Sequence, residues 1–263
     1  FTLIGLRGGL EGFSSTALAV VTSGYFLGFL SGARLTPLMI QRVGHVRVFA
    51  ALGSFMSAAL IALPLLAEPW AWTVLRVLVG FCMYGIYVSA ESWLNAAATN
   101  QTRGKLLSAY MIAQTLGIIG AQGLLTLGDP ATSVLFICAS ILVSVSFAPI
   151  LLSISPTPAF DSTKPMSLRE LYRVSPLGVT GMFLLGGVFS AQFGMAAVYG
   201  SEAGLRLGEI SIFVASFYVG ALITQYPLGW LSDRMDRRQL VAMVTAVGGI
   251  AAVVAVTAGG NFP

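Results

Sequence analysis

The sequence predicts an all-α, polytopic membrane protein, and its composition carries that prediction. Of the 263 residues, 56% are hydrophobic and only 9% are charged, whereas a typical soluble domain has about 25% charged residues. The apolar residues also fall into long runs of about 20, the length that a helix needs to cross a bilayer core of about 30 Å. So few charges could not solvate the surface of a soluble domain of this size.

The same sequence argues against several other classes of protein. The basic residues are sparse and lie between apolar runs, so no surface for nucleic acid is expected. The runs lack the alternation of apolar and polar residues that a transmembrane β-barrel needs. The sequence contains no Gly-x-Ser-x-Gly, His-Glu-x-x-His or Walker motif, and its two cysteines lack the spacing of metal ligands. We therefore expect neither an enzyme nor a cofactor or metal site.

Nine apolar segments predict nine membrane-spanning helices, of which the first is partial. The first segment covers 1–13, and we expect the start of this helix to be missing. The other segments are 16–33, 48–67, 70–94, 106–127, 132–152, 177–199, 210–230 and 240–258. Their many glycines would weaken soluble helices, but small residues permit close helix packing in a membrane.

The longest polar stretch, 153–175, separates six of these segments from the last three. Its prolines indicate a linker, and its end, 167–174, has apolar residues at the spacing of a short amphipathic helix at the membrane interface. The sequence thus predicts an N-terminal six-helix half over 1–152, a linker over 153–175 and three helices of a second half over 176–263.

The charges predict the orientation of the chain in the membrane. Eleven of the 14 Lys and Arg residues lie in the connectors after the second, fourth, sixth and eighth segments: Arg34, Arg42, Arg47, Arg103, Lys105, Lys164, Arg169, Arg173, Arg234, Arg237 and Arg238. The opposite connectors are mainly acidic. Because basic connectors stay on the cytoplasmic side, we expect the loops 34–47 and 231–238 and the linker to be cytoplasmic, and the protein to lie in the cell (plasma) membrane.

The segment 229–238 carries the sharpest motif, Gly-x-Leu-x-Asp-Arg-x-x-Arg-Arg. It resembles a loop motif of the major facilitator superfamily, with Asp236 in place of the family's glycine. A weaker copy over 37–47 keeps Arg42 and Gly44 but has Gln41 where the family usually has Asp. The family's fold has these two loops at equivalent positions of its two halves.

A second motif in the fourth apolar segment supports this resemblance. Arg76 and Gly80 form an Arg-x-x-x-Gly pattern, which resembles a motif of the superfamily that is often linked to proton coupling. The resemblance implies a bundle of twelve helices in two six-helix halves, about nine of them present here. It also implies a secondary active transporter of a small solute that works by alternating access, as a monomer and coupled to protons.

Other interpretations stay open at this point. A non-transporting membrane receptor or scaffold on the same fold is the alternative function. The solute, the direction of transport, symport against antiport, and proton against sodium coupling are not determined by the sequence.

Three ionisable side chains inside the predicted spans are the first candidates for a coupling site. Arg7 and Glu11 are spaced i, i+4 on one helix face, and counting from the helix ends puts Arg76 in the same layer of the membrane. Charges in hydrocarbon are costly and usually line a cavity. We expect Glu11 to bind the proton and Arg76 to be its charge partner or to anchor an anionic or zwitterionic solute. The alternative is a fixed Arg7–Glu11 pair that only neutralises charge.

Further candidates are polar residues in or near the predicted spans. Gln114, Gln192 and Gln225 either line the cavity or hydrogen-bond between helices. Glu91 and Asn95 are candidates for a cytoplasmic gate, or for polar neighbours of an interfacial tryptophan. The two loop motifs predict a charge latch between transport states; the alternative is that their positive charge only determines the topology. The latch residues are Arg42, Gly44, Gly229, Asp233, Arg234, Arg237 and Arg238.

Overall fold

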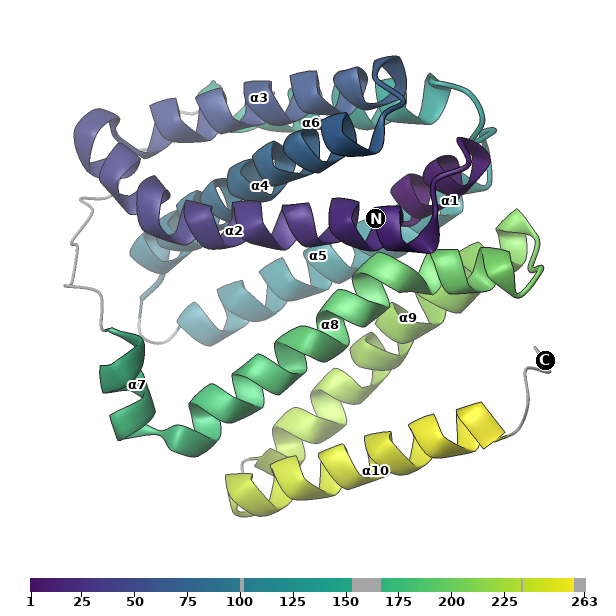
Figure 1. Ribbon diagram of the computed structural model, residues 1–263. Helices are drawn as coiled ribbons and strands as arrows, with labels where there is room; N and C mark the ends of the chain where they lie inside the picture. Colours follow the sequence, from purple (N-terminus) through teal and green to yellow (C-terminus); the bar gives the residue numbers. More distant parts are fainter. Residues whose placement is uncertain (100–101, 153–166, 233, 258–263) are drawn as a thin grey trace.

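The computed structural model describes residues 1–99, 102–152, 167–232 and 234–257. In these residues the regular structure is entirely helical, which confirms the all-α prediction (Figure 1). The helices are α1 (Thr2–Leu10), α2 (Ser15–Val43), α3 (His45–Leu65), α4 (Pro69–Ala97), α5 (Arg103–Leu125), α6 (Val134–Leu151), α7 (Leu168–Val174), α8 (Pro176–Glu202), α9 (Leu207–Ser232) and α10 (Arg237–Thr257).

Seven helices of the described part are long and apolar enough to cross a membrane. These are α2, α3, α4, α6, α8, α9 and α10. Of the two other predicted spans, α1 has only 9 residues. Helix α5 has 23 residues, but it begins with an arginine and a lysine and carries two glutamines. Each predicted apolar segment therefore corresponds to a helix, and the chain is a multi-pass membrane protein.

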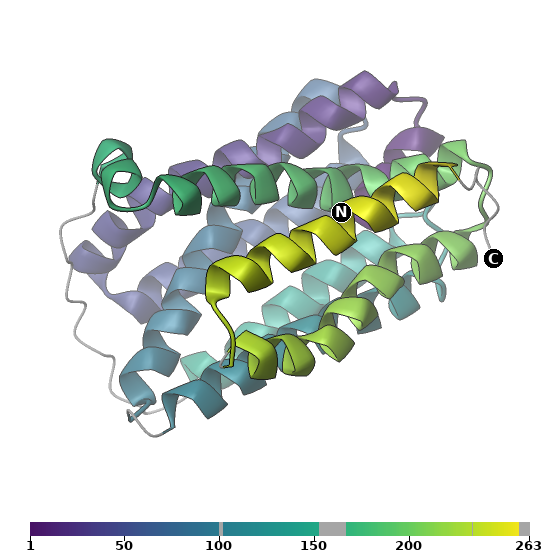
Figure 2. The ribbon, with the colours of Figure 1, turned by 90° about the horizontal axis from the view of Figure 1, so that it is seen from below.

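The long helices run side by side, and their connections alternate between two ends of the bundle (Figures 1 and 2). The α2–α3 corner, the α9–α10 connection and α7 lie at one end, which we call the α7 end. The α1–α2, α3–α4 and α8–α9 connections lie at the opposite end (Figure 1). Apart from Arg206 in the α8–α9 connection, the basic residues of the described connectors thus gather at the α7 end.

The α2–α3 corner differs from the prediction. The sequence predicts a loop over 34–47, but α2 continues to Val43 and α3 begins at His45, so only Gly44 separates them. Residues 34–43 are mainly Leu, Met, Gln and Arg, which are good helix formers, and α2 continues through Pro37. The predicted apolar segment ends at residue 33, where the charged residues begin, but the helix continues beyond it to Val43. Gly44 turns the chain with φ of +84°, a conformation that suits glycine.

The closest helix crossing joins α2 to α4. A Cβ atom on Gly28 would lie 1.9 Å from the carbonyl oxygen of Val77, and one on Gly80 would lie 1.9 Å from that of Tyr25. Two backbones can approach this closely only where side chains are absent. This crossing fixes the position of α4, and with it the position of Arg76.

Candidate functional site

Arg76 is a buried cation in the N-terminal part of α4. Its side chain projects from α4 and the residue is only 5% exposed. The guanidinium carbon lies 4.3 Å from the centre of the Phe1 ring and 4.8 Å from that of Tyr25, within the range of cation–π attraction. Its Nε and Nη2 atoms are buried and have no hydrogen-bond partner in the described residues. Arg76 therefore presents unused donors, which is unusual for a buried charge.

The aromatic side chains beside Arg76 connect the helices before the linker to those after it. Phe1 and Tyr25, at the start of α1 and in α2, pack edge to face with ring centres 4.7 Å apart. Phe1 also contacts Phe193 of α8 at 5.8 Å, and Phe193 contacts Tyr218 of α9 at 5.9 Å. Arg76 thus lies where the two groups of helices meet, which is where a solute could contact both.

Arg7 and Glu11 form an ion pair of their own. Arg7 Nη2 lies 2.5 Å from Glu11 Oε1, and Arg7 Nη1 lies 3.4 Å from the carbonyl oxygen of Pro130. The pair therefore connects the end of α1 to the chain between α5 and α6. Arg76 instead contacts Phe1, six residues before Arg7 and about 9 Å away along a helix. The structure brings Arg7 and Glu11 together and leaves Arg76 apart from them. The sequence predicted all three in one layer because a count of residues takes no account of helix tilt or side-chain length.

The three glutamines occupy different environments. Gln114 on α5 and Gln192 on α8 are half-buried, whereas Gln225 on α9 is exposed. Gln225 Nε2 lies 3.9 Å from the sulfur of Met111 on α5. That contact is a helix–helix bridge between the two groups of helices, so for Gln225 the structure favours the packing interpretation.

Glu91 and Asn95 lie one turn apart near the C-terminal end of α4. Both are exposed, and Asn95 Nδ2 donates a 2.8 Å hydrogen bond to the main-chain oxygen of Glu91. Both residues therefore lie on the exposed surface of α4.

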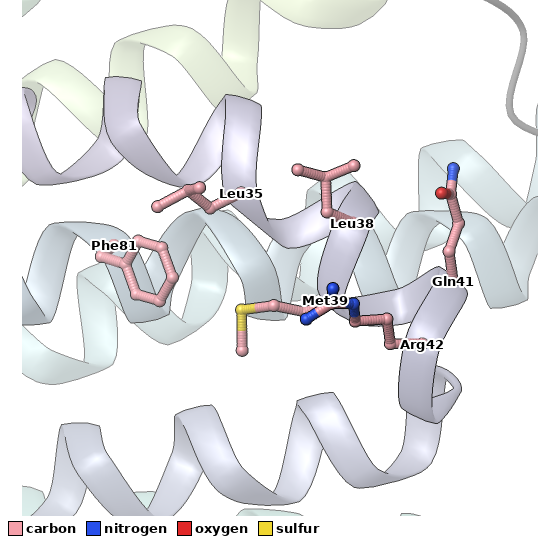
Figure 3. A pocket seen from close by; sticks show the side chains of 6 residues that line it. All are labelled: Leu35, Leu38, Met39, Gln41, Arg42 and Phe81. Carbon is pink, nitrogen blue, oxygen red and sulfur yellow. The ribbon is translucent and has the colours of Figure 1, made fainter.

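Arg42 lies at the C-terminal end of α2, where the side chains enclose a shallow cleft of about 430 Å³ (Figure 3). Its lining residues are Leu35, Leu38, Met39, Gln41, Arg42 and Phe81. In Figure 3 the guanidinium group of Arg42 turns back along the helix toward Met39. Arg42 is exposed, as a residue in a latch would need to be.

The second loop motif begins in α9, which contains Gly229. Arg234 follows this helix, and its guanidinium carbon lies 3.7 Å from the centre of the Trp230 ring. Asp233 lies outside the described residues. A cation–π contact therefore holds the Arg234 side chain against the C-terminal end of α9.

Asp236 explains one departure from the family motif. Its Oδ1 accepts a 2.7 Å hydrogen bond from the backbone N–H of Arg238, and α10 begins at Arg237. Aspartate is a favoured residue at this N-terminal cap position. The residue that replaces the family's glycine thus starts the next helix.

Two parts of the site were not predicted from the sequence. Phe1, Tyr25 and Phe193 resemble the other aromatic residues of apolar helices, so no local signal marks them as neighbours of Arg76. Gly24, Gly28 and Gly32 do carry a signal, because glycine at every fourth position indicates a close helix contact.

Comparisons with known proteins identify the family. The Major Facilitator Superfamily matches residues 9–262. The chain is 29% identical over 241 residues to the uncharacterized MFS-type transporter YcaD of Escherichia coli (strain 536 / UPEC), and 26% identical over 238 residues to YcaD of Escherichia fergusonii. Each alignment covers 90% of this chain and 62% of the relative, so the chain spans less than two thirds of their length. With a match over nearly all its residues, the chain belongs to the Major Facilitator Superfamily, a family of transporters and not of enzymes.

Proposed function

We propose that the whole protein is a secondary active transporter that moves a small solute across the plasma membrane by alternating access, as a monomer. The observation that carries this proposal is Arg76, a buried guanidinium with unused donors where the two groups of helices meet. A charge inside a membrane protein is costly and usually serves a ligand or an ion. Guanidinium groups pair best with carboxylates and phosphates, so the solute is anionic or zwitterionic.

We propose a proton as the coupling ion and Glu11 as its binding site. The ion pair with Arg7 supports this, because a proton on Glu11 would remove the charge that holds Arg7. Arg7 would then be free to break its contact with Pro130, which lies between α5 and α6. Glu11→Gln in the full-length protein should abolish uptake driven by a proton gradient while exchange of solute persists.

We propose that the connectors at the α7 end are cytoplasmic and act as a latch between transport states. The stacking of Arg234 on Trp230 supports a defined position for one latch charge. Asp233→Asn should slow turnover and leave solute affinity unchanged. Equal loss of both would indicate a folding defect and contradict the latch.

The function is tested first by a thermal-shift screen of the full-length protein in detergent against metabolites and drugs, followed by flux measurements in proteoliposomes. A ligand of the folded state raises the apparent melting temperature. Hits that Arg76→Gln loses, and that the control Arg206→Gln keeps, support the transporter with its anchor at Arg76. Arg206 suits the control because its side chain is 87% exposed. Hits without flux would favour the receptor or scaffold.

A further inference from the structure

Arg76 also lines a cavity of about 620 Å³ inside the N-terminal group of helices. Helices α1, α3, α5 and α6 supply most of its wall, with side chains such as Leu63, Leu125 and Phe136. Among the described residues that line it, only Thr2, Gln122 and Arg76 are strongly polar. The volume suits a small organic ligand, and the wall suits an apolar one.

The polar lining is chemically incomplete. Nε and Nη2 of Arg76 and Oε1 of Gln122 are buried and lack hydrogen-bond partners in the described part of the chain. The large majority of buried polar atoms in proteins have a hydrogen-bond partner. Two guanidinium donors suit an anionic oxygen group, and the amide of Gln122 can donate beside it from Nε2 if it rotates to exchange Oε1 and Nε2. The cavity therefore provides a site for one acidic group.

The apolar lining reaches the outside of the bundle. On α5, Leu124 is 49% exposed, and Leu127, just after this helix, is 82% exposed; on α6, Leu142 and Val134 are 56% and 55% exposed. Exposed apolar side chains on membrane-spanning helices face the acyl chains of the bilayer. The cavity thus extends from a buried cation to the lipid-facing surface along α5 and α6.

We propose that this cavity binds a single-chain aliphatic carboxylate of the fatty-acid class, with the carboxylate on Arg76 and the chain along α5 and α6. A hydrophilic solute would lose its hydration in an apolar cavity that offers few replacements. A neutral lipid would leave the guanidinium unpaired. The proposal rests on the proposed function, because Arg76 is the anchor in both, and it adds that the solute enters from within the membrane.

The test measures binding of radiolabelled dodecanoate to the full-length protein in detergent by scintillation proximity. Wild type should bind it saturably, and Arg76→Gln should weaken binding by at least about tenfold, because a desolvated charge pair is lost. Arg76→Lys, which keeps the charge, should retain more affinity than Arg76→Gln. Binding of methyl dodecanoate, which has no charge, should not respond to the Gln substitution.

A second pair of variants tests the position of the chain. Ala121 lines the cavity and Ala113, on the same helix, does not; both are exposed. Ala121→Phe should weaken dodecanoate binding at least about tenfold by filling the cavity, and Ala113→Phe should leave it within about twofold. Absence of saturable binding, or equal binding by the Ala121→Phe variant and wild type, would overturn the proposal.

Two further outcomes separate the possible failures. If added phosphatidylglycerol displaces dodecanoate in wild type, the site belongs to an anionic phospholipid and the fatty-acid assignment is wrong. If a solute from the screen needs Arg76 but is unaffected by Ala121→Phe, the transporter function stands and this inference fails. If dodecanoate binds as expected but does not cross proteoliposome membranes, the inference on binding stands and the proposed transport of this ligand fails.

Discussion

Arg76 has no carboxylate partner among the described residues, and its charge is held only by the faces of Phe1 and Tyr25. A buried guanidinium of this kind costs free energy, because water is removed and only part of its hydrogen bonding is replaced. Residues that bind ligands often carry such a cost. The stability of variants can therefore distinguish a functional arginine from a structural one.

We predict that Arg76→Gln leaves the apparent melting temperature of the ligand-free full-length protein unchanged or raises it by roughly 2–4 °C, about 1 kcal/mol. The substitution removes the desolvated charge and leaves a shorter side chain that is still polar. Trp72→Phe is the contrast, because Trp72 is fully buried and its Nε1 donates a 2.8 Å hydrogen bond to the main-chain oxygen of Leu63. That variant should melt at a lower temperature. A large decrease for Arg76→Gln would mean that the arginine is structural.

The sequence identified Arg76 as a functional candidate but not its neighbours. A single charge in an apolar segment can be recognised from the sequence alone, because placing a charge in the membrane costs free energy and such residues are rare there. Its contacts with Phe1 and Tyr25 depend on how two other helices pack, and nothing in the sequence around those aromatics marks them. By contrast, the ion pair of Arg7 with Glu11 was predictable, since the two residues are only four positions apart in the chain.

At the level of elements, the α2–α4 crossing depends on glycine. We predict that Gly28→Ala destabilises the full-length protein by at least about 1–3 kcal/mol, because the new methyl group would overlap the Val77 carbonyl oxygen. Gly117→Ala on α5 is the matched control, since a Cβ atom there would have no described atom within 4 Å apart from the backbone of its own helix. That variant should be as stable as wild type or slightly more stable. Melting curves of purified protein in detergent compare the two, and equal behaviour would contradict the crossing.

Helix α7 was predicted from its amphipathic pattern, and its start is held by a capping box. Ser167 Oγ accepts from the backbone N–H of Glu170, and Glu170 Oε2 accepts from the backbone N–H of Ser167. The hydrogen bonds that the backbone N–H and the hydroxyl group of Ser167 donate to Oε2 of Glu170 lower the pKa of this carboxyl group. The folded helix binds the proton more weakly than the unfolded segment, so the cap stabilises α7 above the ordinary glutamate pKa of about 4.3 and this stabilisation is lost at lower pH.

The backbone N–H of Leu171 donates a hydrogen bond to the main-chain oxygen of Ser167. We therefore predict that this amide keeps its hydrogen-exchange protection from about pH 8 to pH 5. Below about pH 4.3 the protection should fall, after correction for the intrinsic exchange rate. Ser167→Ala should reduce protection at every pH, because the cap is gone. A variant that retains wild-type protection and its pH dependence would show that packing against α8, and not the capping box, holds this helix.

At the level of the whole molecule, the helices before and after the linker contact each other mainly through α1 with α8 and α5 with α9. At the end opposite α7, Ser15 of α2 donates a hydrogen bond to Glu202 of α8. A Cβ on Gly194 of α8 would lie 2.3 Å from the Thr22 side chain of α2. The sequence predicted two groups of helices but not these contacts, because they join residues about 170 to 190 positions apart and depend on how the two groups pack.

The Ser15–Glu202 contact allows a test of alternating access in the full-length protein. If the two groups of helices rock against each other, this end must open in every transport cycle. Joining Ser15→Cys to Glu202→Cys with an oxidant should therefore stop solute flux in proteoliposomes, and a reducing agent should restore it. Each single variant under the same oxidant controls for Cys82 and Cys138 and should keep its flux. A cross-linked double variant that still transports would mean that this end stays closed throughout, and that the solute crosses by another route through the bundle.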